Sequence, residues 1–370
     1  MRRVSAVVAS LSVLACGCSF SKVDPNASVV VSGTALTAAG RPLANTKVLL
    51  FKQADIGGVL FGGILALGSL GTVCLLPDAP AICNKARTAT TDARGRYHFD
   101  LKGEDTQGSL GTEATLNVVF SGRSSSTTVS FTAKQTAIRL PQARLVNLAP
   151  HVTQPSGRIR VSWSGLPAAA GRQASYSAQL FAAGGQSALW TQTASGRSTS
   201  LDPRLLEDRS GSVAVGASTV LTGSTGAGTV HGYYLSKKLP VRATAGAPPS
   251  RGKRCAPVTG TSPARDGVFS RCAATDGDLD NAARLSGNGV VTGAVVDLGS
   301  VRPVSLVIGR GFTGQVLVEI STNGRSFSTV ATSSGTAVAT EVPGGQRARY
   351  VRLRSPSGLD QSLSSELSVW

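Results

Sequence analysis

Apolar and polar side chains alternate through much of this chain, in short runs bounded by glycine and proline. Val316, Val318 and Ile320, for example, fall on one face of a run, and the residues between them fall on the other. A period of two is typical of strands, whose successive side chains point to opposite faces. Glu and Lys, which favour helices, are scarce, whereas the 370 residues include 43 Gly and 17 Pro. The sequence therefore predicts an all-β protein, and its length predicts two or three domains.

The N-terminus has the parts of an export signal. Two arginines precede an apolar run from Val4 to Ala15, and small residues follow around Cys16 and Cys18. The run is shorter than the roughly 20 apolar residues that span a bilayer, so it does not predict a permanent anchor. It predicts a signal peptide over residues 1–18 that is removed on export.

The sequences Val13-Leu14-Ala15-Cys16 and Ala15-Cys16-Gly17-Cys18 both resemble the lipobox of bacterial lipoproteins. In that family the cysteine becomes the lipidated first residue. The resemblance implies a lipid anchor on Cys16 or Cys18. The short polar segment over residues 19–27 predicts a tether between the membrane and the body of the protein. It also implies a cell-envelope location, at the periplasmic face or the outer surface of an outer membrane. An ordinary secretory signal with incidental cysteines is the alternative.

The four other cysteines form two pairs that are close in sequence, Cys74 with Cys83 and Cys255 with Cys272. Export would place them in an oxidising compartment, where two local disulfides are the simplest pairing. Zinc is the rival interpretation. Neither pair has CxxC spacing, however, and the 3 His of the chain lie elsewhere in the sequence.

The first body of the chain carries a recognisable strand and turn pattern. Residues 40–43 read Gly-Arg-Pro-Leu, and residues 91–99 read Thr-Asp-Ala-Arg-Gly-Arg-Tyr-His-Phe. These segments resemble the carboxypeptidase regulatory-like, transthyretin-like β-sandwich family, and the match covers residues 28–144. The resemblance implies a non-catalytic sandwich.

An uncharged, glycine-rich stretch from Ile56 to Leu76 interrupts this module, within an insertion over residues 54–86. Its length reaches that of a membrane span. A single crossing, however, would separate stretches that should pair in one sandwich, and each glycine weakens an isolated helix by up to about 1 kcal/mol. Three interpretations stay open: a loop or short helical hairpin that is packed on the sandwich and clipped by the disulfide, a surface at 56–76 that docks on a membrane or a protein partner, and a membrane insertion.

A second module follows over residues 145–245. Residues 159–163 read Ile-Arg-Val-Ser-Trp and residues 176–180 read Tyr-Ser-Ala-Gln-Leu, so large apolar side chains recur at every second position. This pattern resembles a fibronectin type III or Ig-like sandwich, in which an early-strand Trp packs in the core. We therefore expect Trp163 in the core. A linker rich in proline and basic residues spans 246–254.

The last module, residues 255–370, has the most specific pattern. Its segments Val-Val-Asp-Leu-Gly (295–299), Ala-Arg-Tyr-Val-Arg-Leu (348–353) and Glu-Leu-Ser-Val-Trp (366–370) occur in the order and at about the spacing of a discoidin, or coagulation-factor type C, module. The resemblance implies a galactose-binding-like jelly roll that binds carbohydrate, phospholipid or protein through loops at one end. The predicted fold is therefore a row of tandem β-sandwiches ending in a discoidin-like jelly roll.

Many discoidin-like modules hold a structural calcium in a D-G-D-x-x-T loop, with a Glu near the C-terminus. The matching residues here are Asp276, Asp278, Asn281 and Glu366, with Asn281 where Thr is usual. Carboxylate and backbone oxygens around a glycine turn suit a hard cation. The resemblance thus implies these residues as calcium ligands, and an acidic turn without metal is the alternative.

Sugar-binding members of the same family use an exposed aromatic residue beside Arg, His or Asn. Phe269 and Phe312 are the aromatic candidates near the ligand-binding end of this module. The resemblance implies them as ligand-binding residues, and the hydrophobic core is the alternative place for either.

Composition and motifs bear on the remaining function classes. The net charge is +17, but most arginines are scattered singly, without a basic helix or the aromatic platform that single-stranded nucleic acids need. Such a charge still attracts anionic lipids and acidic polysaccharides. The chain has no GxSxG, HExxH or Walker motif and no paired carboxylates. The sequence predicts a non-catalytic envelope protein that binds a glycan or another envelope component and no nucleic acid, with a structural scaffold as the alternative.

Overall fold

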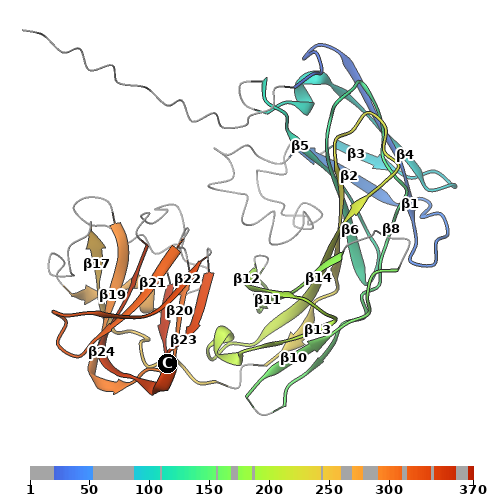
Figure 1. Ribbon diagram of the computed structural model, residues 1–370. Coiled ribbons are helices and arrows are strands. Elements are labelled where there is room, and N and C mark those ends of the chain that lie inside the picture. The colour runs from blue at the N-terminus through green and yellow to red at the C-terminus, as the bar shows by residue number, and fades with distance from the viewer. Residues whose placement is uncertain are drawn as a thin grey trace, which may run out of the picture.

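The protein is almost entirely β-structure (Figure 1). No helix in the described part of the chain is long and apolar enough to cross a membrane. This computed structural model describes residues 21–52, 87–108, 111–155, 157–167, 174–185, 188–242, 245–259, 269–277, 291–310, 315–334, 337–355 and 366–370.

The first sandwich packs two sheets around one apolar core. Along β4 the predicted alternation holds, since Tyr97, Phe99 and Leu101 are buried and the residues between them are exposed. Val31, Phe120 and Phe131 join them in the core. One sheet consists of β1 (Ser28–Leu36), β4 (Arg96–Lys102), β7 (Ala137–Arg139) and β8 (Ala143–Arg144), and the other contains β2 (Lys47–Lys52), β3 (Arg87–Thr90), β5 (Thr115–Ser121) and β6 (Ser125–Thr132).

The second of these sheets continues without a break into the middle sandwich. β6 pairs antiparallel with β15, from Ser125 opposite Ser236 to Ser130 opposite His231. The resulting nine-stranded sheet has the order β12-β11-β14-β15-β6-β5-β2-β3, with β16 beside β14. Residues on either side of the predicted boundary at 144/145 therefore share one sheet. The added strands are β11 (Ala174–Ala182), β12 (Ala188–Ala194), β14 (Gly211–Leu221), β15 (Val230–Ser236) and β16 (Leu239–Val241).

A three-stranded sheet closes the middle sandwich on its other side. It has the order β13-β10-β9, with β9 (His151–Thr153), β10 (Ile159–Ser162) and β13 (Ser198–Leu201). Ile159 and Val161 point into the core with Trp163, which is 6% exposed and lies 6.0 Å from Tyr176 between ring centroids. The prediction that Trp163 is a core residue is confirmed.

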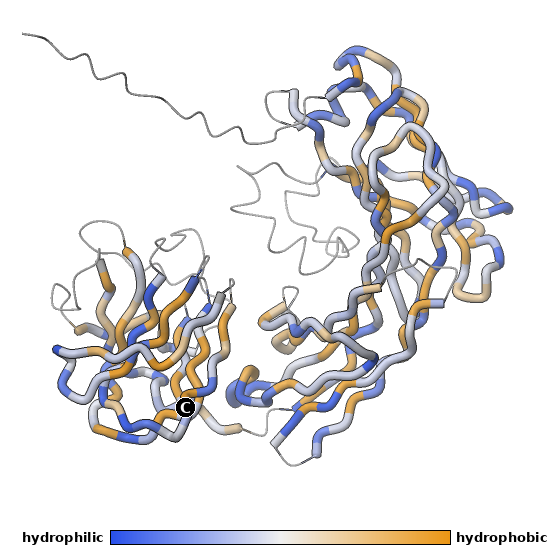
Figure 2. The backbone as a smooth tube through the Cα atoms, in the orientation of Figure 1, coloured by the Kyte–Doolittle hydropathy of each residue, from blue (hydrophilic) through white to orange (hydrophobic). Residues whose placement is uncertain are grey.

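The C-terminal sandwich has a six-stranded sheet facing a three-stranded one. Val318, Ile320, Val351 and Leu353 fill the space between them, on the faces that the alternation predicts. Hydrophobic and hydrophilic residues are interleaved along the strands of this sandwich (Figure 2). The predicted all-β class with tandem β-sandwiches is confirmed. The larger sheet is β18 (Ser270–Arg271), β17 (Arg254–Thr259), β19 (Val291–Pro303), β24 (Arg347–Arg354), β21 (Gln315–Ser321) and β22 (Ser328–Ser334), and the smaller is β23 (Ala337–Glu341), β20 (Leu306–Arg310) and β25 (Glu366–Val369).

The small sheet of the C-terminal sandwich packs its outer face on the middle sandwich. Leu306 and Ile308 belong to the same buried cluster as Trp163. Glu207, which follows the 3-10 turn η7 (Pro203–Leu206), is fully buried at this contact. It accepts hydrogen bonds from the Ser368 hydroxyl on β25 and from the Arg251 guanidinium in the linker. The two sandwiches are therefore docked through both apolar and charged groups.

One of the two predicted disulfides lies within the described residues. Cys255 on β17 is bonded to Cys272, with 5.4 Å between their Cα atoms. This bond confirms the predicted local pairing, and it links the two ends of the segment that carries Phe269. Cys74, Cys83, the lipidation candidates Cys16 and Cys18, and the stretch 56–76 lie outside the described residues.

Candidate functional site

The outer face of the six-stranded sheet in the C-terminal sandwich carries an aromatic cluster. Phe269, Phe327 and Tyr350 are half-buried there, against a floor of Val258 and Val295. The rings of Phe269 and Tyr350 lie 5.9 Å apart between centroids. The outer face of a sandwich is ordinarily the polar face of its sheet, so three aromatic rings together on it mark this face as unusual.

A buried ion pair lies beside these rings. Glu319 on β21 and Arg352 on β24 are direct cross-strand neighbours, and Arg352 Nε donates to Glu319 Oε2 at 2.6 Å. Arg354 reaches the same carboxylate at 3.5 Å. The Arg352 guanidinium also lies over the Phe327 ring, 4.0 Å from its centroid. Together, Phe269, Phe327, Tyr350, Arg352 and Glu319 are called the aromatic–arginine face.

Arg352 has hydrogen-bonding capacity that the protein leaves unused. Its side chain is only 7% exposed, yet its Nη1 has no hydrogen-bond partner. A buried donor without a partner is costly and is therefore uncommon in folded proteins. A guanidinium that is held at Nε by Glu319 and stacked on Phe327 is fixed in one orientation, and its Nη1 is left unpaired and covered from solvent.

Neighbouring residues hold Tyr350 in place. Arg349 forms a bidentate pair with Asp297, at 2.8 and 2.9 Å, and its guanidinium lies 5.0 Å from the Tyr350 ring centroid. The hydrogen bonds from Arg349 hold the pKa of Asp297 below its usual range, so the carboxylate stays charged.

The hairpin after β21 also limits the position of the Tyr350 ring. Gly324 has φ +71°, and a Cβ at this position would come within 3.1 Å of that ring. Glycine is therefore needed here both for the backbone conformation and for the close approach.

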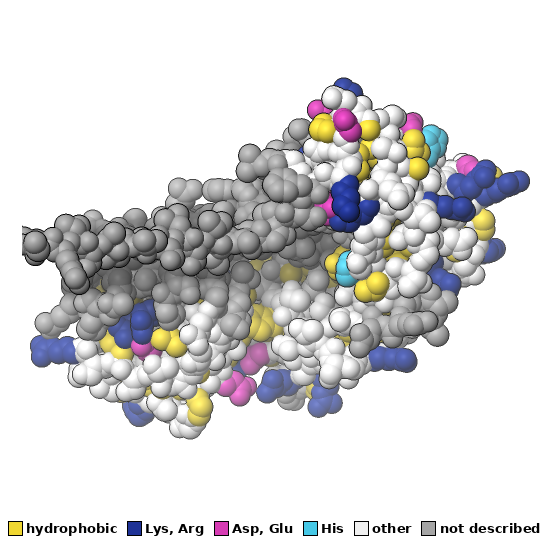
Figure 3. All heavy atoms as spheres, turned by 45° about the horizontal axis from the view of Figure 1, so that its top comes forward, with side chains coloured by type: hydrophobic (Ala, Val, Ile, Leu, Met, Phe, Trp, Pro, Cys, Tyr) yellow, Lys and Arg dark blue, Asp and Glu magenta, His cyan; other side chains and the backbone are white. Residues whose placement is uncertain are grey.

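Aromatic rings beside a fixed guanidinium and carboxylate have a defined chemical use. The rings offer flat apolar surfaces to the C–H faces of a ligand, and the charged groups form strong, directional hydrogen bonds. Such a face suits a ligand that is apolar on one side and rich in hydroxyls at its edge. On the face of the molecule that Figure 3 shows, Lys and Arg occur at several separate places.

The described half of the predicted calcium site is formed by Glu366 and Asp276. Glu366 Oε1 accepts a hydrogen bond from the backbone N–H of Gly277 at 3.2 Å, while its buried Oε2 has no hydrogen-bond partner. Burial and the nearby carboxylates of Glu207 and Asp276 raise the pKa of Glu366 to about 8. A buried carboxylate oxygen that has no hydrogen-bond partner and lies near other carboxylates is the kind of ligand that a hard cation such as calcium prefers.

The other residues predicted for these sites fall outside this geometry. Asp278, Asn281 and Phe312 lie outside the described residues. Within the described ranges, no group of three or more His, Cys, Asp or Glu side chains is arranged to hold a metal.

The structure adds Tyr350 and Phe327 to the sequence prediction, which named Phe269 alone within this cluster. The signal for Tyr350 was present in the alternation of β24, since Val351 and Leu353 face the core and Tyr350 therefore shares the outer face with Arg352. Phe327 follows a hairpin, and its place depends on that turn.

No protein-family model matches the chain, and no curated protein matches it either. Among solved structures, CpGH89CBM32-5 from Clostridium perfringens, in complex with GalNAc-β-1,3-galactose, is 15% identical, with a TM-score of 0.26 over 32% of this chain and 95% of that one. A SusE-like protein is 10% identical, with a TM-score of 0.23 over 59% and 93% of the two chains. A fucolectin from striped bass (Morone saxatilis) serum is 11% identical, with a TM-score of 0.23 over 68% and 83%.

The first structures that the chain matches are much longer than the shared part. For a family 89 glycoside hydrolase of Clostridium perfringens, the match covers 14% of that chain. At these TM-scores the likeness carries no conclusion about the function of this chain.

Proposed function

We propose that this chain is a non-catalytic binding protein of a bacterial cell envelope, and that it holds carbohydrate on the aromatic–arginine face of its C-terminal sandwich. The observation that carries the proposal is the position of Arg352, which is buried between Phe327 and Glu319 with an unused donor. Sugar rings present both apolar C–H faces and hydroxyl edges, so they match both parts of this surface.

In this proposal each group has a separate task. Phe269 and Tyr350 stack on the apolar side of a sugar ring. Arg352 Nη1, which is covered in the free protein, donates to a sugar oxygen when the ligand displaces its cover, while Glu319 keeps the guanidinium in place. Because the guanidinium is already oriented in the free protein, it loses little conformational entropy on binding.

A glycan array that includes neutral and acidic sugars, probed with the full chain in calcium and in chelator, tests this function. We expect binding to a limited set of sugars. A flat array with a normally folded protein would contradict the proposal.

The envelope location rests on the N-terminal sequence. In our proposal the signal is removed, Cys16 or Cys18 is lipidated, and the acyl chains hold the protein at the outer membrane. The chain would then present its ligand-binding face from the membrane, to the periplasm or to the cell surface.

We also propose that calcium binds at Glu366 and Asp276 as a structural ion, with Asp278 and Asn281 as further ligands. Adding calcium to the full chain should raise its melting temperature, because a ligand at about 100 times its Kd stabilises the native state by roughly 2.7 kcal/mol. Glu366→Gln should lose most of this gain. Magnesium, which demands a tighter octahedral site, is the matched control and should have a smaller effect. Equal melting temperatures with and without calcium in the wild type would exclude the site.

A structural role is the second candidate, and one observation favours it. The three sandwiches are connected by a continuous sheet and a buried contact, as a rigid spacer requires. In that case residues 56–76 would bind a protein partner in an envelope complex. The glycan array separates the two functions.

A further inference from the structure

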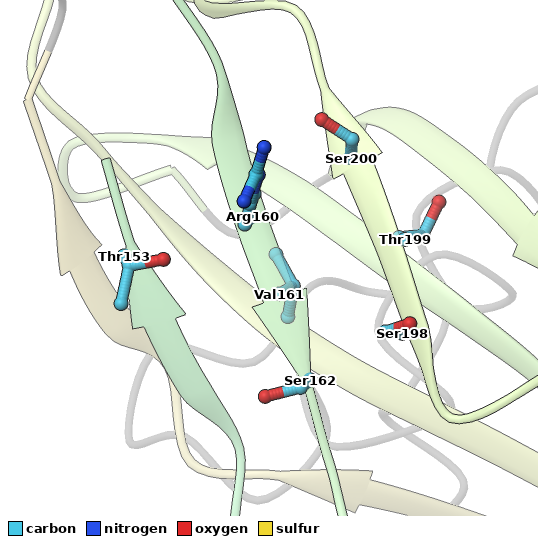
Figure 4. Close-up of a pocket in the computed structure, with 7 residues that line it drawn as sticks. All are labelled: Thr153, Arg160, Val161, Ser162, Ser198, Thr199 and Ser200. Carbon is cyan, nitrogen blue, oxygen red and sulfur yellow. The ribbon is translucent and has the colours of Figure 1, made fainter. Parts of the chain in front are cut away.

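A concave surface lies on the outer face of the three-stranded sheet in the middle sandwich (Figure 4). It encloses about 460 Å³, and we call it the hydroxyl groove. Its lining residues are Thr153 on β9, Arg160, Val161 and Ser162 on β10, and Ser198, Thr199 and Ser200 on β13.

Strand alternation explains why this surface is polar. Ile159 and Val161 point into the core, so Arg160 and Ser162 point outward from the middle strand. Arg160 lies directly opposite Thr153 on one side and Ser200 on the other. Figure 4 shows Arg160 on the middle strand between these two residues. The guanidinium is therefore flanked by a hydroxyl on each neighbouring strand.

Several polar groups of the groove have no polar partner among the residues that the structure describes. Arg160 forms no ion pair or side-chain hydrogen bond with another described residue, and the same holds for the hydroxyls of Thr153, Ser162 and Ser200. Arg158, by contrast, reaches Glu341 at 4.0 Å. The groove thus offers one exposed guanidinium and several hydroxyls to a ligand.

The charge of the groove selects the ligand class. Arg160 is the charged residue of the lining, which contains no carboxylate, and the exposed His151 lies opposite Ser162 at one end. A guanidinium pairs in bidentate fashion with carboxylate or sulfate, and hydroxyls exchange hydrogen bonds with sugar hydroxyls. The lining has no aromatic side chain on which nucleic-acid bases could stack.

We propose that the hydroxyl groove binds an acidic polysaccharide, with Arg160 pairing to a carboxylate or sulfate and the flanking Ser and Thr residues binding sugar hydroxyls. This site is separate from the aromatic–arginine face, and the proposal holds whether or not that face binds sugar.

Binding of the full chain to immobilised polygalacturonate, at low and high salt, tests the proposal. Arg160→Ala should weaken binding at low salt by about tenfold or more, because hydrogen bonds to a charged group are among the strongest polar contacts. Arg139→Ala is the matched control, since it removes the same charge from an exposed position on β7. It should change the affinity less than about twofold, as expected for a distant surface charge. Neutral dextran should not bind.

The outcomes separate the alternatives. Equal losses in Arg160→Ala and Arg139→Ala would show attraction to net charge alone, and absence of wild-type binding would also overturn the proposal. If Arg160→Ala loses single-stranded DNA binding but keeps polygalacturonate binding, the groove is a nucleic-acid site and the proposal is wrong. Tyr350→Ala should keep polygalacturonate binding, so failure of the aromatic–arginine face leaves this result unaffected.

Discussion

Replacing Glu207 with alanine should lower the free energy of unfolding of the full chain by about 3 kcal/mol or more, as expected when one partner of a buried ion pair is removed. Glu207 is fully buried between the middle and C-terminal sandwiches, where it pairs with Arg251 and accepts the Ser368 hydroxyl. Without its carboxylate, the buried Ser368 hydroxyl would lose its acceptor, and Arg251 would keep its ion pair with Asp208 but lose the buried one.

Arg310 adds to this cost. Its Nη2 donates to the Leu205 carbonyl at 2.9 Å, but its Nε and Nη1 have no hydrogen-bond partner. Burial lowers the pKa of Arg310, and the carboxylates of Glu207 and Glu366 act in the opposite direction. Removing Glu207 would therefore leave this buried guanidinium with less compensating charge.

Urea denaturation, followed by circular dichroism, measures the effect. Glu341→Ala is the control, because Glu341 lies on the same small sheet with its side chain 73% exposed. It should change the stability by less than about 0.5 kcal/mol, as usual for a surface position. If Glu207→Ala unfolds at the same urea concentration as the wild type, the buried contact between the sandwiches does not stabilise the protein.

Phe131→Ala should have the second large effect, a loss of about 3–5 kcal/mol, typical of a deleted core aromatic. Phe131 is 1% exposed in the core of the first sandwich. It lies on β6, whose partner β15 belongs to the middle sandwich. Because one sheet runs through both sandwiches, the loss should spread from β5 to β14.

Hydrogen exchange with mass spectrometry follows this spread. In Phe131→Ala, amides of β5 and β14 should lose protection together. Val220→Ala, at a position that is 46% exposed on β14, should leave both strands protected. Loss of protection confined to residues 28–144 would show that the two sandwiches unfold as independent units despite their shared sheet.

Local patterning was enough to predict much of the fold. The period of two predicted which side chains of β4 and β24 enter the core, and large apolar size together with the family resemblance predicted Trp163 there. The close spacing of Cys255 and Cys272 predicted their disulfide.

The continuous sheet was beyond such patterns, because it depends on which distant strands meet. β6 and β15 are about a hundred residues apart, and nothing local in β6 specifies its partner. Both faces of β6 are buried, although Ser and Thr fill most of its positions.

The candidate sites were predictable only in part, because they too depend on which distant strands meet. Phe269 was identified from its residue type and place in the module, whereas the partners that give it a role come from other strands and a hairpin. Arg352 bonds to Glu319 through Nε and stacks on Phe327, and its Nη1 has no hydrogen-bond partner. These contacts depend on the fold, so the sequence of β24 alone does not predict them. Glu207 carries no local signal, because its partners lie in the linker and at the C-terminus.

Titration calorimetry with the strongest array glycan tests sugar binding on the aromatic–arginine face most directly. Tyr350→Ala should raise the Kd at least about tenfold, because it removes an aromatic contact and the ring that supports Phe269. Tyr233→Ala is the matched control, since it removes a half-buried tyrosine from the outer face of the nine-stranded sheet. We expect wild-type affinity for Tyr233→Ala. Equal affinity in wild type and Tyr350→Ala would contradict sugar binding on the aromatic–arginine face.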